Sequence, residues 1–233
     1  MAPVPDPNLE LIEEAARRLG PLLGELTLVG GCAARLLVTD PGASPVRPTL
    51  DVDLVVEAAT YAEYQRFCDR LRGRGFTERT GADAPICRWH HGNLVIDVMP
   101  LEEAVLGFSN RWYREAIRNR LRRRLPSGAE VAHIDGPHFL ATKLDAFRAR
   151  GRADYVASAD LEDVVIVIDG RASIEREVEG ASNELRSHVA AGIAELLGDR
   201  MFMEALPGYF PTADEASGRL GALRARLSRL AAR

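Results

Sequence analysis

The chain has very little lysine: Lys143 is the only one beside 29 arginines among 233 residues. Cysteine is scarce as well. Cys32, Cys68 and Cys87 lie far apart, which excludes a disulfide framework and a zinc site built on paired cysteines. No apolar run approaches the roughly 20 residues that a membrane-spanning helix needs, and the N-terminal segment is acidic rather than basic. These absences predict a cytoplasmic protein with no membrane partner.

The remaining composition is that of an ordinary globular protein, with 46% hydrophobic and 27% charged residues. A chain of this length forms either one large domain or two closely packed lobes. The formal net charge of −4 excludes a protein that binds nucleic acid through overall positive charge, so any such binding must rely on a local patch.

The first half of the chain predicts a mixed sheet with flanking helices. Residues 8–20 have the pattern of an amphipathic helix that Asn8 caps. A strand at 26–29 runs through a double glycine into a short helix, and a second strand begins at Leu50. Three short β-prone runs, at 76–79, 86–90 and 94–99, predict an antiparallel extension of the sheet.

The second half predicts mostly helices, after a short strand at 129–134. Residue types at 161–168 favour a strand, whereas Asp160 as a cap and the following Gly170 favour a helix, and we expect a helix. The fold class is therefore α/β (α+β): a catalytic lobe over residues 1–135, then a helical lobe over 136–233 that closes the active-site cleft.

Three aspartates stand inside apolar, strand-like runs. Asp51 and Asp53 are two residues apart, so a strand projects both carboxylates to one side, and Asp97 is a third acid in the run 94–99. If the two strands are neighbours, the three acids converge. Such a group needs either open water or a cation, and it suggests a two-metal site, whereas each acid alone could equally face solvent at a strand end.

The double glycine Gly30-Gly31 lies upstream of the acid pair. A glycine turn at a helix start presents free backbone N–H groups that a phosphate can approach closely, although many such turns are only tight turns.

These motifs together resemble the nucleotidyltransferase superfamily of the DNA polymerase β type, which has a Gly-Gly-Ser turn, an Asp-x-Asp strand and a later third Asp. The matching segments are Val29-Gly-Gly-Cys32, Arg47-Pro-Thr-Leu-Asp51-Val-Asp53 and Ile96-Asp97. Two later segments, Ala141-Thr-Lys143-Leu-Asp-Ala-Phe-Arg148 and Asp160-Leu-Glu-Asp163-Val, are similar to the AbiEii and MenT group, the toxins of type IV toxin–antitoxin systems. The resemblance covers roughly residues 26–170.

The resemblance implies roles for the matching residues. Asp51 and Asp53 would hold both metal ions, Asp97 would complete the ion nearer the acceptor hydroxyl, and Lys143 would contact the triphosphate. It assigns catalysis to Asp51, Asp53, Asp97, Lys143 and Asp160, and nucleotide binding to Gly30, Gly31, Cys32, Arg47, Thr49, Lys143 and Asp163. Cys32 replaces the usual serine, and its thiol is a weaker donor to a triphosphate oxygen than a hydroxyl.

The activity that the resemblance implies is transfer of a nucleoside monophosphate from a nucleoside triphosphate, with Mg²⁺ or Mn²⁺, to a hydroxyl acceptor. The toxin group points to RNA, with the 3′ end of tRNA as the expected target and a separate antitoxin protein as a partner. A small-molecule or protein acceptor is the alternative within the enzyme class. A nucleotide-binding regulatory module without turnover is the alternative outside it.

A run of arginines lies close to Trp112 and Tyr113 in the sequence: Arg118, Arg120, Arg122, Arg123 and Arg124. Such a run either follows a phosphate backbone or forms a solvated face with salt bridges. His90-His91 lacks the further ligands of a zinc site.

Overall fold

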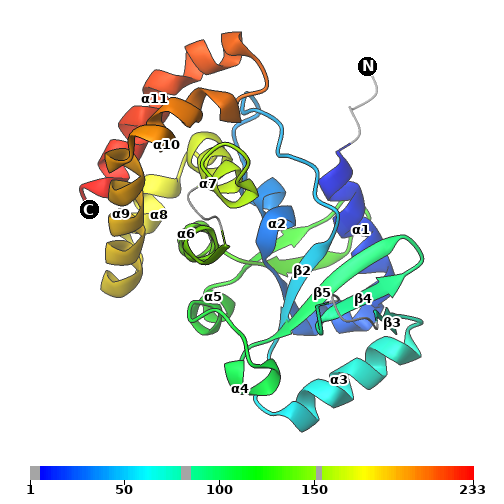
Figure 1. Cartoon of the computed structure of the whole chain (residues 1–233). Helices are drawn as coiled ribbons and strands as arrows, with labels where there is room; N and C mark the ends of the chain where they lie inside the picture. Colours follow the sequence, from blue (N-terminus) through cyan, green and yellow to red (C-terminus); the bar gives the residue numbers. More distant parts are fainter. Residues whose placement is uncertain (1–5, 80–84, 151–153) are drawn as a thin grey trace, which may run out of the picture. The chain divides into compact units, whose positions relative to one another are not determined.

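The computed structural model describes residues 6–79, 85–150 and 154–233 (Figure 1). Its backbone groups into two compact units. One, here called the sheet unit, contains the residues up to Arg35 together with Pro48–Ile134. The other, the helical unit, contains Leu36–Arg47 together with Asp135–Arg233. The expected division after residue 135 left residues 36–47 in the first lobe, whereas the structure groups them with the second.

The sheet unit is built on seven strands in the order β3-β4-β5-β2-β1-β7-β6. They are β1 (Leu26–Leu28), β2 (Val52–Val56), β3 (Thr77–Glu78), β4 (Arg88–His91), β5 (Leu94–Pro100), β6 (Leu121–Arg124) and β7 (Glu130–His133). The pairs β2–β5 and β1–β7 are parallel, and the other neighbours are antiparallel. The predicted mixed sheet and its antiparallel extension are therefore confirmed.

The central strands are anchored by one fully apolar face, while the other face carries the acids. In β2, four of the five residues are buried, and β5 buries Leu94, Ile96 and Val98 with less than 4% exposure. The buried Tyr64 hydroxyl donates a hydrogen bond to the carbonyl oxygen of Val98 at 2.8 Å, which ties a helix to this sheet. The acids of β2 and β5 thus stand on well-packed elements.

Helices and short turns complete the sheet unit: α1 (Pro7–Leu19), η1 (Gly20–Glu25), α2 (Gly30–Leu37), α3 (Tyr61–Gly73), α4 (Glu103–Leu106) and α5 (Tyr113–Arg118), of which α2 runs on into the helical unit. The expectation that Asn8 caps the first helix is wrong. Asp6 is the cap, because its carboxylate accepts a hydrogen bond from Leu9 N and Pro7 fits the first helical position.

The helical unit contains α6 (Gly136–Arg150), α7 (Ala159–Gly170), α8 (Ile174–Glu179), α9 (Asn183–Gly198), α10 (Arg200–Ala205), η2 (Leu206–Tyr209) and α11 (Ala213–Ala231). The run 161–168 is a helix, as expected. Its β-branched residues are tolerated there because α7 is buried almost all round, with α6 and α11 packed against it. No helix in the described ranges is long and apolar enough to cross a membrane.

Ser158, and not Asp160, caps α7. Its hydroxyl accepts a hydrogen bond from Leu161 N at 3.3 Å, which leaves the Asp160 side chain free to make ion pairs. We expect Ser158→Ala to lower the free energy of unfolding by about 1 kcal/mol in urea denaturation, because a helix N–H loses its acceptor. Ser158→Asp should restore that loss, since aspartate caps as well as serine. Equal stability of wild type and Ser158→Ala would contradict the assignment.

Candidate active site

The three predicted acids meet at neighbouring strands of the sheet unit. Asp53 in β2 lies directly opposite Asp97 in β5 in the parallel register, and Asp51 immediately precedes β2. On the other side of β5, Arg88 at the start of β4 lies directly opposite Asp97. Residues paired in this way project to the same face, so Arg88, Asp97 and Asp53 form one row across three strands.

Arg88 bridges two of these acids. Its Nε and Nη2 donate to Oδ1 and Oδ2 of Asp97 at 2.8 and 2.7 Å, and Nη2 also donates to Asp51 Oδ2 at 2.5 Å. The hydrogen bonds to Asp97 and the nearby negative charges raise the pKa of Arg88, although partial burial opposes the shift. The guanidinium therefore remains charged at every physiological pH, and it counters the repulsion between the carboxylates.

The carboxylates of Asp51, Asp53 and Asp97 are of the type that binds divalent metal ions, but they are not arranged as the ligand group of a metal site. Carboxylate oxygens are the ligands that Mg²⁺ and Mn²⁺ prefer, and a cationic group already bridges Asp51 and Asp97. Within the described parts of the chain, however, no three His, Cys, Asp or Glu side chains are placed as a ligand group. The donors thus fit a metal ion, while Arg88 holds two of them.

The double glycine turn lies against Asp53, one of the three aspartates Asp51, Asp53 and Asp97 that we call the acid row. Gly30 has a φ of +62°, in the left-handed region, and it begins α2. A Cβ at this position would stand 1.8 Å from Asp53 Oδ2, so only glycine permits this approach of backbone and carboxylate. The backbone N–H of Val29 also donates to the carbonyl oxygen of Asp53 at 2.9 Å. The turn and β2 therefore form one tightly packed element.

Cys32 and Thr49 contact one another beside this turn. The Cys32 Sγ lies 2.7 Å from Thr49 Oγ1 and 3.5 Å from the carbonyl oxygen of Asp51. Asn8 Oδ1 accepts hydrogen bonds from both the backbone N–H and the hydroxyl of Thr49, at 2.9 and 3.1 Å. Both residues are thus committed to contacts within the protein, and the buried Asn8 fixes the segment that leads to Asp51.

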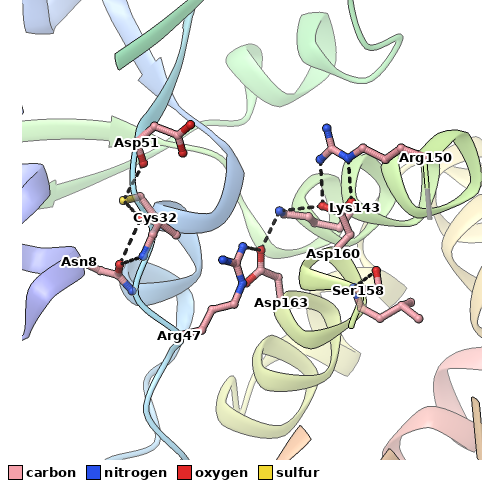
Figure 2. A network of polar contacts seen from close by, with 11 residues as sticks. Asn8, Cys32, Arg47, Asp51, Lys143, Arg150, Ser158, Asp160 and Asp163 are labelled. Atoms are coloured by element: carbon pink, nitrogen blue, oxygen red, sulfur yellow. Dashed lines mark hydrogen bonds and ion pairs between the residues drawn. The ribbon is translucent and has the colours of Figure 1, made fainter. Parts of the chain in front are cut away.

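The helical unit holds a second charged cluster, around Lys143 in α6 (Figure 2). Lys143 Nζ lies 3.0 Å from Asp160 Oδ1 and 2.7 Å from Asp163 Oδ2, and all three side chains are less than 10% exposed. Asp163 also accepts two hydrogen bonds from Arg47, at 3.1 and 3.0 Å, and Asp160 accepts two from Arg150, at 3.0 and 3.1 Å. Three cations thus face two carboxylates.

The opposite charges of this cluster offset the free-energy cost of burying them. Burial alone would lower the pKa of Lys143, but Asp163 and Asp160 outweigh it and hold that pKa above its ordinary value. Likewise, burial opposes but does not prevent the lowering of the Asp160 pKa by Arg150 and Lys143. Lys143 is therefore a charged and immobilised side chain, which suits the binding of an anion only after an aspartate has been exchanged for that anion.

The structure distributes the predicted residues over the two units. Gly30, Gly31, Cys32, Thr49, Asp51, Asp53 and Asp97 lie in the sheet unit, and Arg47, Lys143, Asp160 and Asp163 lie in the helical unit. Within each unit they lie close together. Arg88, Arg150 and Asn8 were not predicted. The turn at Gly92-Asn93 fixes the pairing of Arg88 with Asp97 and was the available signal for Arg88.

Comparison with known proteins supports the fold. The chain is similar to the crystal structure of an antigenic nucleotidyltransferase-like protein from Paracoccidioides brasiliensis, with a TM-score of 0.53 and 19% sequence identity. The match covers 90% of this chain and 96% of that one. This chain therefore has a nucleotidyltransferase-like fold. No family model matches it, and no curated protein matches its sequence.

The Gly30 turn gives a direct test of the packing against Asp53. We expect Gly30→Ala to lower the free energy of unfolding by at least about 1 kcal/mol, from the left-handed backbone alone, and by more through displacement of Asp53. Gly24→Ala is the matched control, because a Cβ there meets no atom within 4 Å. Thermal and urea denaturation would measure both. Similar stability of the two variants would contradict the close approach.

The Asp163 side chain is fully buried between Lys143 and Arg47, so its charge is needed there. We expect Asp163→Asn to cost about 3 kcal/mol of unfolding free energy, because two cations lose their shared partner. In a double-mutant cycle with Lys143→Met, the combined loss should be smaller than the sum of the two single losses. Strictly additive losses would show that the pair does not interact.

Proposed function

We propose that the protein is a nucleotidyltransferase that transfers a nucleoside monophosphate from a nucleoside triphosphate to a hydroxyl acceptor. The observation that carries the proposal is the row of Asp53 and Asp97 on adjacent parallel strands, with Asp51 beside it and the Gly30 turn against it. In the reaction, the acceptor oxygen forms a bond to the α-phosphorus, the bond to the pyrophosphate oxygen breaks, and the acceptor hydroxyl loses its proton.

Asp51, Asp53 and Asp97 are the residues that would hold Mg²⁺ or Mn²⁺. Bound ions supply charge stabilisation to the attacking and leaving oxygens of such a displacement. The protein's own contribution would be positioning: the sheet register places Asp53 of β2 opposite Asp97 of β5, and the start of α2 would offer backbone N–H groups to phosphate oxygens.

The proposed role of Lys143 and its aspartates rests on the resemblance to the toxin group and on the cluster's own contacts. Lys143 would contact a triphosphate. Asp160 and Asp163 hold its ammonium group in place, and Arg47 and Arg150 neutralise the aspartates from their other side. Asp160 and Asp163 are in this view positioning residues that keep the lysine charged and oriented until an anion replaces one of them.

For the acceptor we propose the 3′ hydroxyl of an RNA, with tRNA as the first candidate. Support comes from β6, whose residues Leu121–Arg124 are all exposed at the edge of the sheet, three of them arginines. Exposed arginines on an edge strand suit contacts with a phosphate backbone, and they also protect the edge from pairing with another strand. Transfer to tRNA would arrest growth, which is the proposed toxin role, with a separate antitoxin as the partner.

A transfer assay tests the proposal. The protein is incubated with each of the four α-labelled nucleoside triphosphates, Mg²⁺ or Mn²⁺, and total cellular RNA. We expect label on a tRNA-sized band, and we expect Asp51→Asn/Asp53→Asn to lose at least about 10²-fold of it, since the charge that stabilises the transferred phosphate is removed. Asp69→Asn is the matched control, because Asp69 is an exposed acid on α3 that pairs only with Arg72 among the contacts seen.

The alternatives give different results in the same assay. Label that appears on a small molecule or on a protein, and disappears in Asp51→Asn/Asp53→Asn, would replace RNA with another acceptor. Stabilisation of the protein by a triphosphate without any transfer would favour a regulatory nucleotide-binding module. A protein that neither transfers label nor responds to any triphosphate would refute the proposal.

A further inference from the structure

We propose that Arg88 is a built-in competitor of the metal ion: it occupies Asp51 and Asp97 in the resting protein and must leave both before a divalent ion binds there. Arg88 would thereby set the metal affinity of the site. The inference rests on the proposed function, because it takes the three aspartates as metal ligands.

The geometry of the contacts carries the first step. Arg88 Nη2 is shared between Asp51 Oδ2 at 2.5 Å and Asp97 Oδ2 at 2.7 Å, while Nε takes Asp97 Oδ1 at 2.8 Å. Both oxygens of Asp97 are therefore occupied by one planar fork, as is one oxygen of Asp51. A divalent ion that used Asp97 would need at least one of the same oxygens.

The strand register places Arg88 beside Asp97. Arg88 is the first residue of β4 and lies directly opposite Asp97, and its strand is fixed by the hairpin to β5. The guanidinium lies at the site because of this pairing and does not depend on a loop. Its side chain is 23% exposed, which leaves a route for it to rotate toward solvent.

Charge carries the second step. The three carboxylates bring three negative charges to the site, and Arg88 places one positive charge at the oxygens of Asp51 and Asp97 that a divalent ion would use. A guanidinium and a divalent cation at neighbouring oxygens would repel one another strongly in this partly buried place. We therefore expect metal binding to displace the Arg88 contacts, so that the free energy of those contacts is subtracted from the free energy of metal binding.

The test measures Mn²⁺ binding without nucleotide, by isothermal titration calorimetry and by the electron paramagnetic resonance signal of free Mn²⁺. We expect Arg88→Gln to bind Mn²⁺ at least about 10-fold more tightly than the wild type, which corresponds to about 1.4 kcal/mol. Arg70→Gln is the matched control. It removes another two-pronged arginine–carboxylate contact, with Glu25, that lies away from the acids, and it should leave the Mn²⁺ affinity unchanged.

A second readout covers the case in which Arg88→Gln is poorly folded without metal. Mn²⁺ should then raise its melting temperature by more than it raises that of the wild type, because the ion replaces the missing positive charge. Arg88→Lys keeps the charge but lacks the planar fork, so its affinity should lie between those of the wild type and Arg88→Gln. Addition of Asp97→Asn to Arg88→Gln should abolish the gain, which would place the ion at this row.

The outcomes separate this inference from the proposed function. If neither Arg88 variant binds Mn²⁺ more tightly or gains more thermal stability from it than the wild type, Arg88 is not a competitor, while the transfer assay can still succeed. If tighter binding is seen but no transfer occurs with any acceptor, the competition stands and the proposed function fails.

Discussion

The repulsion between carboxylates placed side by side is the constraint around which the sheet unit is organised. The parallel register of β2 and β5 puts Asp53 directly opposite Asp97, and nothing in that backbone arrangement relieves the charge. The relief comes from Arg88 on the next strand. Because Asp53 and Asp97 stand on strands whose other face is buried in the core, the sheet sets their separation, and a cation at this row offsets their repulsion.

The helical unit buries a positive charge and stabilises it with side chains of opposite charge. The buried charge is the ammonium group of Lys143, and two buried aspartates provide the opposite charges that stabilise it. Each of those aspartates is in turn held by an arginine. In both units, side chains proposed to meet a ligand are already paired within the protein: Asp51 and Asp97 with Arg88, and Lys143 with Asp160 and Asp163. Ligand binding would therefore have to exchange these ion pairs.

Much of the fold could be read from the sequence because the central strands β1, β2 and β5 are largely apolar runs with glycine or proline nearby. The acids stood out for the same reason, as charged residues within such runs. Arg88 did not stand out, since one arginine among 29 carries no compositional signal. Only the register of the hairpin, which pairs Arg88 with Asp97 across Gly92-Asn93, identifies it. Asn8 has the residue type of a helix cap, but Asp6 and Pro7 make an equally good start two residues earlier, and the helix begins there.

The division of the chain between the two units was harder to predict because it is decided by tertiary contacts. Residues 36–47 look like a loop of the first lobe, rich in proline and small residues. In the structure, the backbone N–H groups of Thr39 and Asp40 both donate to the carbonyl oxygen of Gly170, and Arg219 binds Asp40 and the carbonyl oxygen of Gly42. No local pattern encodes partners so far along the chain.

That placement has a consequence for synthesis on the ribosome. The segment 36–47 lies between β1 and β2, yet its partners Gly170 and Arg219 are made long after it. The two strands emerge first, while the connection between them stays without these partners until α7 and α11 have been made. A chain released before α11 would therefore contain every aspartate of the acid row but would lack the anchor of the loop that leads to it.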